Sequence, residues 1–451
     1  MNEKPCDLTI KEATSVITSG RLSVLQLVES CLERIDDLEE TIQAWVLVDR
    51  DGAIESAQHL DQELERGKRR GPLHGIPFGI KDIFYTAGLR TEAGSQSWSG
   101  FVPSYDATSV ARLKEAGAII LGKTHTTEFA YRDPAPTRNP WNTDHTPGGS
   151  SSGSGASVAA GMCLAALGSQ TLGSTLRPAA YNGIVGFKPH YGRISTYGVV
   201  PLAWTLDHVG ILARSVEDAA LVFQTIAGHD SMDCHSLSDA VPIFPSNLDS
   251  QKIPRLGLVQ QYFFDNTDKE MRSHINDVTE RFRQAGAEVH EIEFPCDFSE
   301  ILDNGHTIMA VEAATYHQAM FIKHKEHYRT EMSKLIEQGL STSAIEYAKV
   351  LETRLQQYAS VEPLLYQVDA LLIPGAVGAA PRGLASTGSP VMQGPWTIMG
   401  VPTISLPTGL NKDGLPLAIQ LAGHPKAEDH LLTTARWCER VLNVQLRLPF
   451  V

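Results

Sequence analysis

The segment that most constrains this chain is Pro147-Gly148-Gly149-Ser150-Ser151-Ser152-Gly153-Ser154-Gly155, which after its proline holds only glycine and serine. Such a run is often a flexible linker between domains. Here it leads without a break into the nearly apolar stretch from Ala156 to Leu167. Glycines at the start of a helix let backbone N–H groups converge on a ligand or on a developing negative charge. The run therefore indicates a site in front of a helix, which we expect from about residue 157 to residue 167.

Two other glycine motifs can be tested against the same run. The segment from Gly149 to Gly153 formally matches the G-x-S-x-G turn of α/β-hydrolases, but that turn follows an apolar strand. The residues before the run, from Trp141 to Thr146, do not form one. A phosphate-binding loop would end in glycine, lysine and then serine or threonine, and the run does not. It therefore fits neither motif.

A second glycine-serine turn follows at Gly173-Ser174, and a lysine in an apolar setting precedes both turns. Amide hydrolysis requires a nucleophile, a base and N–H donors for the tetrahedral oxyanion. A serine on a tight turn can supply the first and the last of these. Lys81 follows Phe78-Gly79-Ile80, and a lysine can act as a base when burial removes its charge. Taken alone, such a lysine more often pairs with an acid or extends its charged end to water.

Helical and strand patterns alternate along the chain. Residues 8–66 have the apolar spacing of two or three amphipathic helices. A buried strand is predicted at 78–80, ending at Lys81, then a helix at 110–117 and a strand at 118–122. Further strands are predicted at 370–374, 403–407 and 415–421, and a closing helix at 429–442. Residues 262–360 are charged and helix-patterned, as a cap over a site would be. This order favours an α/β layered fold.

Composition excludes some functions. Lys plus Arg is 38 and Asp plus Glu is 52, which gives a formal net charge of −14. An acidic surface repels phosphate backbones, so we expect no nucleic-acid partner. The six cysteines are scattered without a C-x-x-C pair, as in a cytosolic chain with reduced thiols. The first residues lack a secretory profile, and the longest apolar run is too short to cross a bilayer. We therefore expect a cytoplasmic protein without a membrane partner.

Together these segments resemble the amidase signature family over nearly the whole chain. The family's glycine-serine core corresponds to Gly148–Ser154, and its nucleophile turn to Gly173-Ser174 followed by Arg177-Pro178-Ala179. The matches continue in order along the sequence: Gly75-Ile76-Pro77-Phe78-Gly79-Ile80-Lys81-Asp82, Gly122-Lys123-Thr124-His125-Thr126-Thr127-Glu128-Phe129-Ala130, Ile184-Val185-Gly186-Phe187-Lys188-Pro189, Leu206-Asp207-His208-Val209-Gly210 and Leu415–Leu421.

The resemblance implies a Ser–cis-Ser–Lys triad. The nucleophile is then Ser174, the bridging serine after a cis peptide bond is Ser150, and the neutral base is Lys81. Backbone N–H groups of Thr171, Leu172, Gly173 and Ser174 would bind the oxyanion, and the carbonyl group of Ala130 would touch substrate or nucleophile.

The resemblance also implies an architecture. We expect one domain over residues 1–451, an α/β/α sandwich with a mixed central sheet, with core motifs at about 71–220 and a helical cap at about 262–360. No metal or organic cofactor is expected, and a homodimer is expected from family habit alone.

The chain departs from the family pattern beside the nucleophile. Leu172 stands where relatives usually have a glycine, and Gln170 where an aspartate is common. Arg177 follows the nucleophile by three residues, whereas many relatives have an arginine two residues after it. This spacing resembles the malonamidase-like branch, in which the arginine binds a substrate carboxylate. For Arg177 itself we expect a structural ion pair, and binding of a substrate carboxylate is the alternative. Aryl-amide and urethane hydrolases also belong to this broad family.

The sequence is compatible with three functions. We expect an amidohydrolase that acts on a small amide or carbamate. The amidase subunit of a tRNA-dependent amidotransferase is the first alternative, although its turn usually has the shorter arginine spacing and an aspartate. A catalytically silent binding relative is the second, and the presence of all three triad residues argues against it. His324 and His327 lie in a charged helical stretch without an H-E-x-x-H motif, so a solvated helix face explains them better than a metal site.

Overall fold

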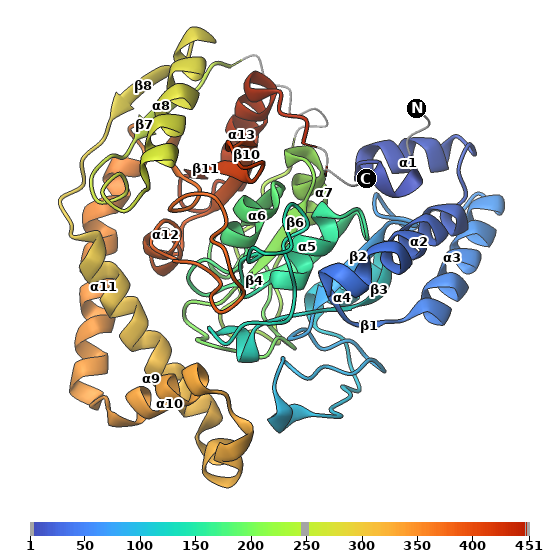
Figure 1. Ribbon diagram of the computed structural model, residues 1–451, viewed down its shortest axis with the longest axis horizontal. Coiled ribbons are helices and arrows are strands. Elements are labelled where there is room, and N and C mark those ends of the chain that lie inside the picture. Colours follow the sequence, from blue (N-terminus) through green and yellow to red (C-terminus); the bar gives the residue numbers. More distant parts are fainter. Residues whose placement is uncertain (1–3, 245–251, 447, 449–451) are drawn as a thin grey trace.

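An eleven-stranded mixed sheet runs through the protein (Figure 1). The computed structural model describes residues 4–244, 252–446 and 448. The strand order is β1-β3-β2-β4-β6-β5-β10-β11-β9-β7-β8. The pairs β2–β3, β2–β4, β7–β8 and β7–β9 are parallel, and the other pairs are antiparallel. The strands are β1 (Trp45–Val48), β2 (Pro77–Lys81), β3 (Ile119–Thr124), β4 (Ala165–Gln170), β5 (Val185–Lys188), β6 (His208–Ala213), β7 (Arg255–Leu258), β8 (Glu288–Glu291), β9 (Ala370–Pro374), β10 (Thr403–Leu410) and β11 (Pro416–Ala422).

Helices cover the sheet because its central strands are apolar at nearly every position. All residues of β2, β4, β6, β9 and β11 are buried, and strands that are buried on both faces require cover on both sides. The helices are α1 (Ile10–Thr18), α2 (Val24–Ile42), α3 (Arg50–Glu65), α4 (Thr108–Glu115), α5 (Ser152–Ala159), α6 (Leu176–Asn182), α7 (Val216–Ile226), α8 (Lys269–Gln284), α9 (Phe298–His324), α10 (Thr330–Ser341), α11 (Ala344–Leu365), α12 (Gly394–Ile398) and α13 (Glu428–Leu442). The predicted α/β layered fold is confirmed.

The amphipathic pattern of the first 66 residues is confirmed as α1, α2 and α3. In α2 the apolar positions Val24, Leu27, Val28, Cys31, Leu32 and Ile35 are all buried. Ser23 caps this helix by accepting a hydrogen bond from the Gln26 N–H. Sequence analysis missed β1, which lies between α2 and α3 and pairs with β3. Its four residues are too few for a strand period to stand out beside two long helices.

The helix predicted for residues 157–167 is wrong. The helix there, α5, begins inside the serine run at Ser152 and ends at Ala159, and the chain then enters β4 at Ala165. Gly161 has a φ of +71°, a left-handed conformation that ends the helix and turns the chain toward the sheet. The apolar stretch is buried in both elements, so its composition alone could not separate a helix from a strand.

The glycine-serine run is packed rather than flexible, and Gly153 gives a test of this. Its N–H donates to the His125 carbonyl at 3.0 Å, and a carbon added at its Cα would lie 2.1 Å from the Ala44 oxygen. Because backbone atoms cannot yield to such an overlap, we expect Gly153→Ala to lower the free energy of unfolding by about 3 kcal/mol. Urea unfolding followed by circular dichroism measures this loss. Gly71→Ala is the control, since its added carbon would lie 3.2 Å from the nearest atom, and an equal loss in both variants would contradict the packing argument.

Helices α9, α10 and α11 extend from one end of the sheet and are called the cap below (Figure 1). The stretch 262–360, expected to be helical, also contains β8, which pairs with β7 at the edge of the sheet. Only residues from Phe298 onward therefore form the helical extension. Within the described ranges, no helix is long and apolar enough to span a membrane.

Candidate active site

Lys81 lies at the end of β2, between the neighbouring strands β3 and β4, and its side chain is fully buried. Its Nζ donates hydrogen bonds to Ser150 Oγ and to Ser169 Oγ, each at 2.7 Å. The parallel pairing of Ile80 with Leu167 brings Lys81 level with the end of β4, where Ser169 lies. The lysine therefore contacts two hydroxyl groups and lies at the meeting point of two strands and the serine run.

Burial lowers the pKa of Lys81 well below its ordinary value, since removing an ammonium group from water disfavours its charged form. Among the residues that the structure describes, Asp207 is the one charged group that opposes this shift. None of the described Asp or Glu residues forms an ion pair with Lys81. A lowered pKa favours the uncharged amine, and only the uncharged amine can accept a proton.

Ser150 is held by backbone hydrogen bonds on both sides of the serine run. The peptide bond between Gly149 and Ser150 is cis. The Ser150 carbonyl accepts from the Thr127 N–H at 3.2 Å and from the Ser152 N–H at 2.9 Å. These contacts fix its Oγ, which is fully buried, against Lys81.

Ser174 lies beside the serine run, because the Ser151 N–H donates to the Ser174 carbonyl at 3.2 Å. Ser174 is 8% exposed, while Lys81 and Ser150 are completely buried. Its hydroxyl has no hydrogen-bond partner among the described residues. The structure therefore joins Lys81 to Ser150 directly and brings Ser174 next to them through the backbone, without a hydrogen bond between the two serine hydroxyls.

The turn before Ser174 presents free N–H groups. Within the described ranges, the backbone N–H groups of Leu172, Gly173 and Ser174 have no acceptor. Buried N–H groups are nearly always paired in folded proteins, so a cluster of unpaired ones suits an anionic ligand. Leu172 has no positive φ, and its side chain packs near Gly394 at the start of α12. A leucine at this position is therefore compatible with the backbone of the turn.

The side chains of Gln170, Thr397 and Asp207 hold this turn and keep its N–H groups in place. Gln170 Oε1 accepts from the N–H groups of Thr175 and Leu176, each at 2.9 Å. The Leu172 carbonyl accepts from Thr397 Oγ1 of α12 at 2.7 Å. Thr171 Oγ1 donates to Asp207 at 2.6 Å.

Ala130 lies on the rim of the same region. It has a φ of 62°, and its carbonyl oxygen accepts no hydrogen bond from the described residues. A small cavity is lined by Ala130, Ser169, Thr171 and Asp207, together with apolar residues that include Val199 and Leu202. The structure thus brings this residue to the same cavity as the turn.

Arg177 is buried in α6, directly behind the nucleophile turn. Its Nη2 donates to the Gly149 carbonyl at 2.7 Å and to Thr387 Oγ1 at 3.1 Å. It makes no ion pair with any described residue, so the expected structural ion pair is not found. Burial lowers its pKa to about 10, which leaves it charged at neutral pH. Its buried Nε also lacks an acceptor. Arg177 therefore supports the peptide before Ser150 and retains an uncompensated positive charge.

Sequence analysis missed two contributors to this site. Ser169 contacts Lys81, and its only sequence signal is its place on the strand that leads to Ser174. Asp207 lies in a motif that matches the family, but the motif assigns it no role; its carboxylate binds Thr171 at the start of the turn and lines the cavity. Both contacts depend on strand neighbours that are not adjacent in sequence.

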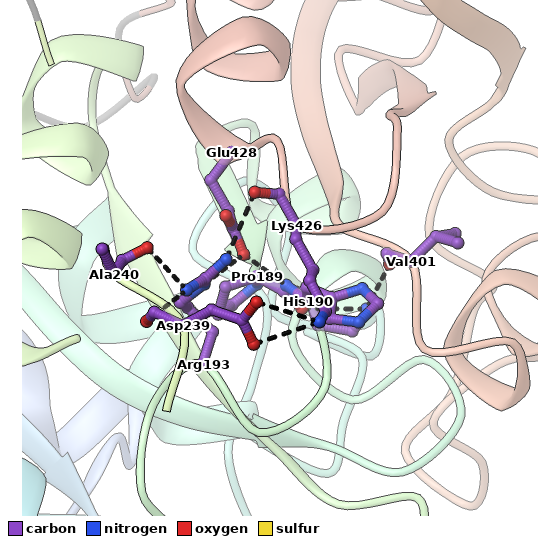
Figure 2. Close-up of polar contacts among 9 residues, drawn as sticks. Pro189, His190, Arg193, Asp239, Ala240, Val401, Lys426 and Glu428 are labelled. Atoms are coloured by element: carbon purple, nitrogen blue, oxygen red, sulfur yellow. Dashed lines mark hydrogen bonds and ion pairs between the residues drawn. The ribbon is translucent and has the colours of Figure 1, made fainter. Parts of the chain in front are cut away.

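Lys188 is another buried lysine in the recognised motifs, as is Lys123, and its contacts are those of a structural residue. Burial lowers its pKa to about 7, and its Nζ donates to the carbonyl groups of Val401 at 2.6 Å and Pro189 at 3.2 Å. Figure 2 shows the adjoining cluster, in which Arg193 lies between Glu428 of α13 and the backbone of Asp239 and Ala240. These contacts tie the chain after β5 to the start of α13.

One group among the described residues has metal-ligating side chains close together: His324, Glu326 and His327, whose ligand atoms lie within 4.8 Å of one another. They lie at the end of α9 and on the short helix after it. His324 and Glu326 are exposed, and the two imidazole rings stack. The group belongs to the outer part of the cap and not to the cavity described above.

A family model described as Amidase matches residues 26–432. A glutamyl-tRNA(Gln) amidotransferase subunit from Carboxydothermus hydrogenoformans is 37% identical, covering 96% of this chain and 97% of its own. Putative amidase AmiD of Mycobacterium bovis is 35% identical, covering 95% and 92%. Among solved structures, peptide amidase from Stenotrophomonas maltophilia superposes with a TM-score of 0.86 at 29% identity, covering 98% of each chain.

Proposed function

Since the chain belongs to the Amidase family, we propose that it hydrolyses the C–N bond of a small amide or carbamate through an acyl-Ser174 intermediate. The observation that supports this most is the 2.7 Å contact between the buried Lys81 Nζ and Ser150 Oγ, beside the turn that carries Ser174. A buried lysine without an acid partner among the described residues suits a base better than a structural cation.

The proposed proton path runs from Ser174 to Lys81 through Ser150. As Ser174 Oγ attacks the substrate carbonyl carbon, its proton passes to Ser150 Oγ, and the Ser150 proton passes to the neutral Nζ of Lys81. The same groups return a proton to the leaving nitrogen, which departs as ammonia or an amine. Water then attacks the acyl ester by the reverse path and releases the acid. Ser169, which also contacts Nζ, holds the lysine in line with Ser150.

The N–H groups of Leu172, Gly173 and Ser174 are the proposed oxyanion donors. Each donor that meets the developing negative charge lowers the barrier by about 3 kcal/mol in comparable sites. We also propose that the carbonyl group of Ala130 accepts a hydrogen bond from the substrate or the nucleophile.

Arg177 supports a preference for substrates that carry a carboxylate. It is a buried cation without an ion-pair partner in the described part of the chain, and it lies behind the nucleophile turn. An anionic group in the site would compensate this charge. Because Arg177 also holds the Gly149 carbonyl, its loss affects all substrates, and the preference shows only in a ratio of rates.

A second candidate is the amidase subunit of a tRNA-dependent amidotransferase. Gln170 and the spacing of Arg177 argue against it. The comparisons favour it more, since the relative with 37% identity belongs to such an enzyme and matches this chain along nearly its full length. The proposed chemistry at Ser174 is the same in both cases. The candidates differ in whether a partner is required and in what receives the ammonia.

One assay tests the function and separates the two candidates. The purified chain is given primary amides, carbamates and ureas, each with and without a free carboxylate, and release of ammonia or amine is measured. Turnover by the chain alone supports a separate amidase, whereas turnover only after addition of the partner subunits of an amidotransferase supports the second candidate. No release of ammonia or amine, by the chain alone or with partner subunits, would overturn the proposed function.

We expect Arg177→Gln to lower kcat/KM at least tenfold more for carboxylate-bearing substrates than for neutral ones, by loss of a charged hydrogen bond.

A further inference from the structure

Asp207 connects the nucleophile turn to a neighbouring loop. It directly precedes β6, and its Oδ1 accepts from Thr171 Oγ1 at 2.6 Å. Its Oδ2 accepts from the N–H groups of Leu202 at 2.8 Å and Ala203 at 3.0 Å. Part of its surface faces the cavity that Ser169 and Thr171 also line. One carboxylate therefore fixes both the start of the turn and the loop 202–207.

Glu312 of the cap accepts hydrogen bonds from the same loop. It is fully buried in α9, and its carboxylate accepts from the Thr205 N–H at 2.9 Å and from Thr205 Oγ1 at 2.7 Å. Tyr347 of α11 donates to the same carboxylate at 2.9 Å. Inside the loop, the N–H groups of Leu206 and Asp207 both donate to the Ala203 carbonyl at 2.8 Å. The loop is thus a short, internally bonded connection between the cap and Thr171.

We propose that Asp207 is a positioning residue for the reaction at Ser174, holding Thr171 at the head of the nucleophile turn, and that Glu312 of the cap holds Asp207 in place through the loop 202–207. This inference rests on the proposed function, because it concerns the geometry of the same turn. It gives the cap a role in positioning the proposed oxyanion donors.

The charge of Asp207 adds an electrostatic effect on the base. Burial raises its pKa to about 7, against the hydrogen bonds that favour the ionised form, and the Glu312 carboxylate raises it further. Among the described residues, the Asp207 charge acts on Lys81 and on Tyr191, and in both cases it raises the pKa. Removing this charge therefore lowers the pKa of Lys81, so that more of the lysine is neutral at a given pH. A residue needed only for folding would not move the pH profile in this way.

The test compares Asp207→Asn, Thr171→Val, their double variant and Glu312→Gln in the full-length chain. We expect Asp207→Asn to lower kcat about 30-fold with less than a threefold change in KM, since displaced catalytic groups cost rate more than binding. The acidic limb of its pH profile should move to lower pH. The double variant should lose little more than Asp207→Asn alone, because Thr171→Val removes only a contact that Asp207→Asn already weakens. Glu312→Gln should lower kcat by about threefold to tenfold, since Glu312 acts on the turn only indirectly, through the loop 202–207 and Asp207.

Asp218→Asn is the matched control, because Asp218 is also a fully buried carboxylate that accepts from a backbone N–H, in α7. We expect it to lower stability without a change in kcat or pH profile. If Asp207→Asn behaves like Asp218→Asn, or if its effect and that of Thr171→Val are additive, the inference is wrong while the proposed function stands. If the unmodified chain hydrolyses nothing, with or without partner subunits, the proposed function itself fails.

Discussion

Replacing Ser174 by alanine is expected to lower turnover by at least about 10⁴-fold, because loss of the nucleophile removes the acyl-enzyme route altogether. The fold should persist, since the Ser174 hydroxyl bonds to no described residue and its carbonyl contact with Ser151 does not depend on the side chain. Release of ammonia or amine measures the loss, and circular dichroism with thermal unfolding checks the fold. Mass spectrometry of the unmodified chain during turnover should detect an acyl group on Ser174.

Ser157→Ala is the control for this prediction. Ser157 is a fully buried serine of α5, and its Oγ donates to the Ser154 carbonyl at 3.1 Å. Its loss should leave turnover within about threefold of the unmodified chain, since surface and core changes away from the reacting atoms act mainly on stability. A fully active Ser174→Ala variant, or an acyl group found on another serine, would refute the assignment of the nucleophile.

Replacing Lys81 by methionine is expected to lower turnover by about 10³-fold, in line with the loss of a general base. Methionine keeps an unbranched chain of similar length without a proton acceptor. Burial lowers the pKa of Lys81, and only the neutral form can accept a proton. In the unmodified chain the rate should therefore rise as pH increases through that lowered pKa and level off above it. The residual rate of Lys81→Met should lack this rise.

Lys188→Met separates a catalytic lysine from a buried structural one. Both lysines are fully buried, and both have lowered pKa values, but Lys188 donates to two backbone carbonyl groups. We expect Lys188→Met to lower the midpoint of thermal unfolding while the pH dependence of the remaining activity stays that of the unmodified chain. An acidic limb that survives in Lys81→Met and disappears in Lys188→Met would reverse the two roles.

The strands that local pattern could identify are those with apolar runs between clear turns. The predicted strands at 78–80, 370–374, 403–407 and 415–421 are confirmed as β2, β9, β10 and β11, with ends that differ by at most three residues. The helix predicted at 157–167 is wrong because an unbroken apolar run has no period, and the turn at Gly161 divides it between α5 and β4. Strands β5 and β6 were not predicted as elements at all.

The residues of the site also fall into those that local sequence could identify and those that it could not. Motifs could single out Lys81, Ser150 and Ser174, since each lies in a distinctive local segment, although their catalytic roles remain predictions. Contacts made by partners remote in sequence could not be found. Ser169 reaches Lys81 only because β2 pairs in parallel with β4, and Asp207 reaches Thr171 only because β6 pairs with β4 on its other side. Pairing across a sheet is not recorded in any single stretch of residues.

The contact between Thr397 and the carbonyl group of Leu172 has a consequence for synthesis of the protein. Lys81, Ser150 and Ser174 leave the ribosome early, but α12, which supports their turn, follows more than 200 residues after Ser174, at Gly394–Ile398. Chains grow from the N-terminus at about 5–20 residues per second, so a nascent chain carries these three residues for some 10–40 seconds before that support is made. A ribosome-bound fragment that stops before α12 therefore has all three residues and an unsupported turn.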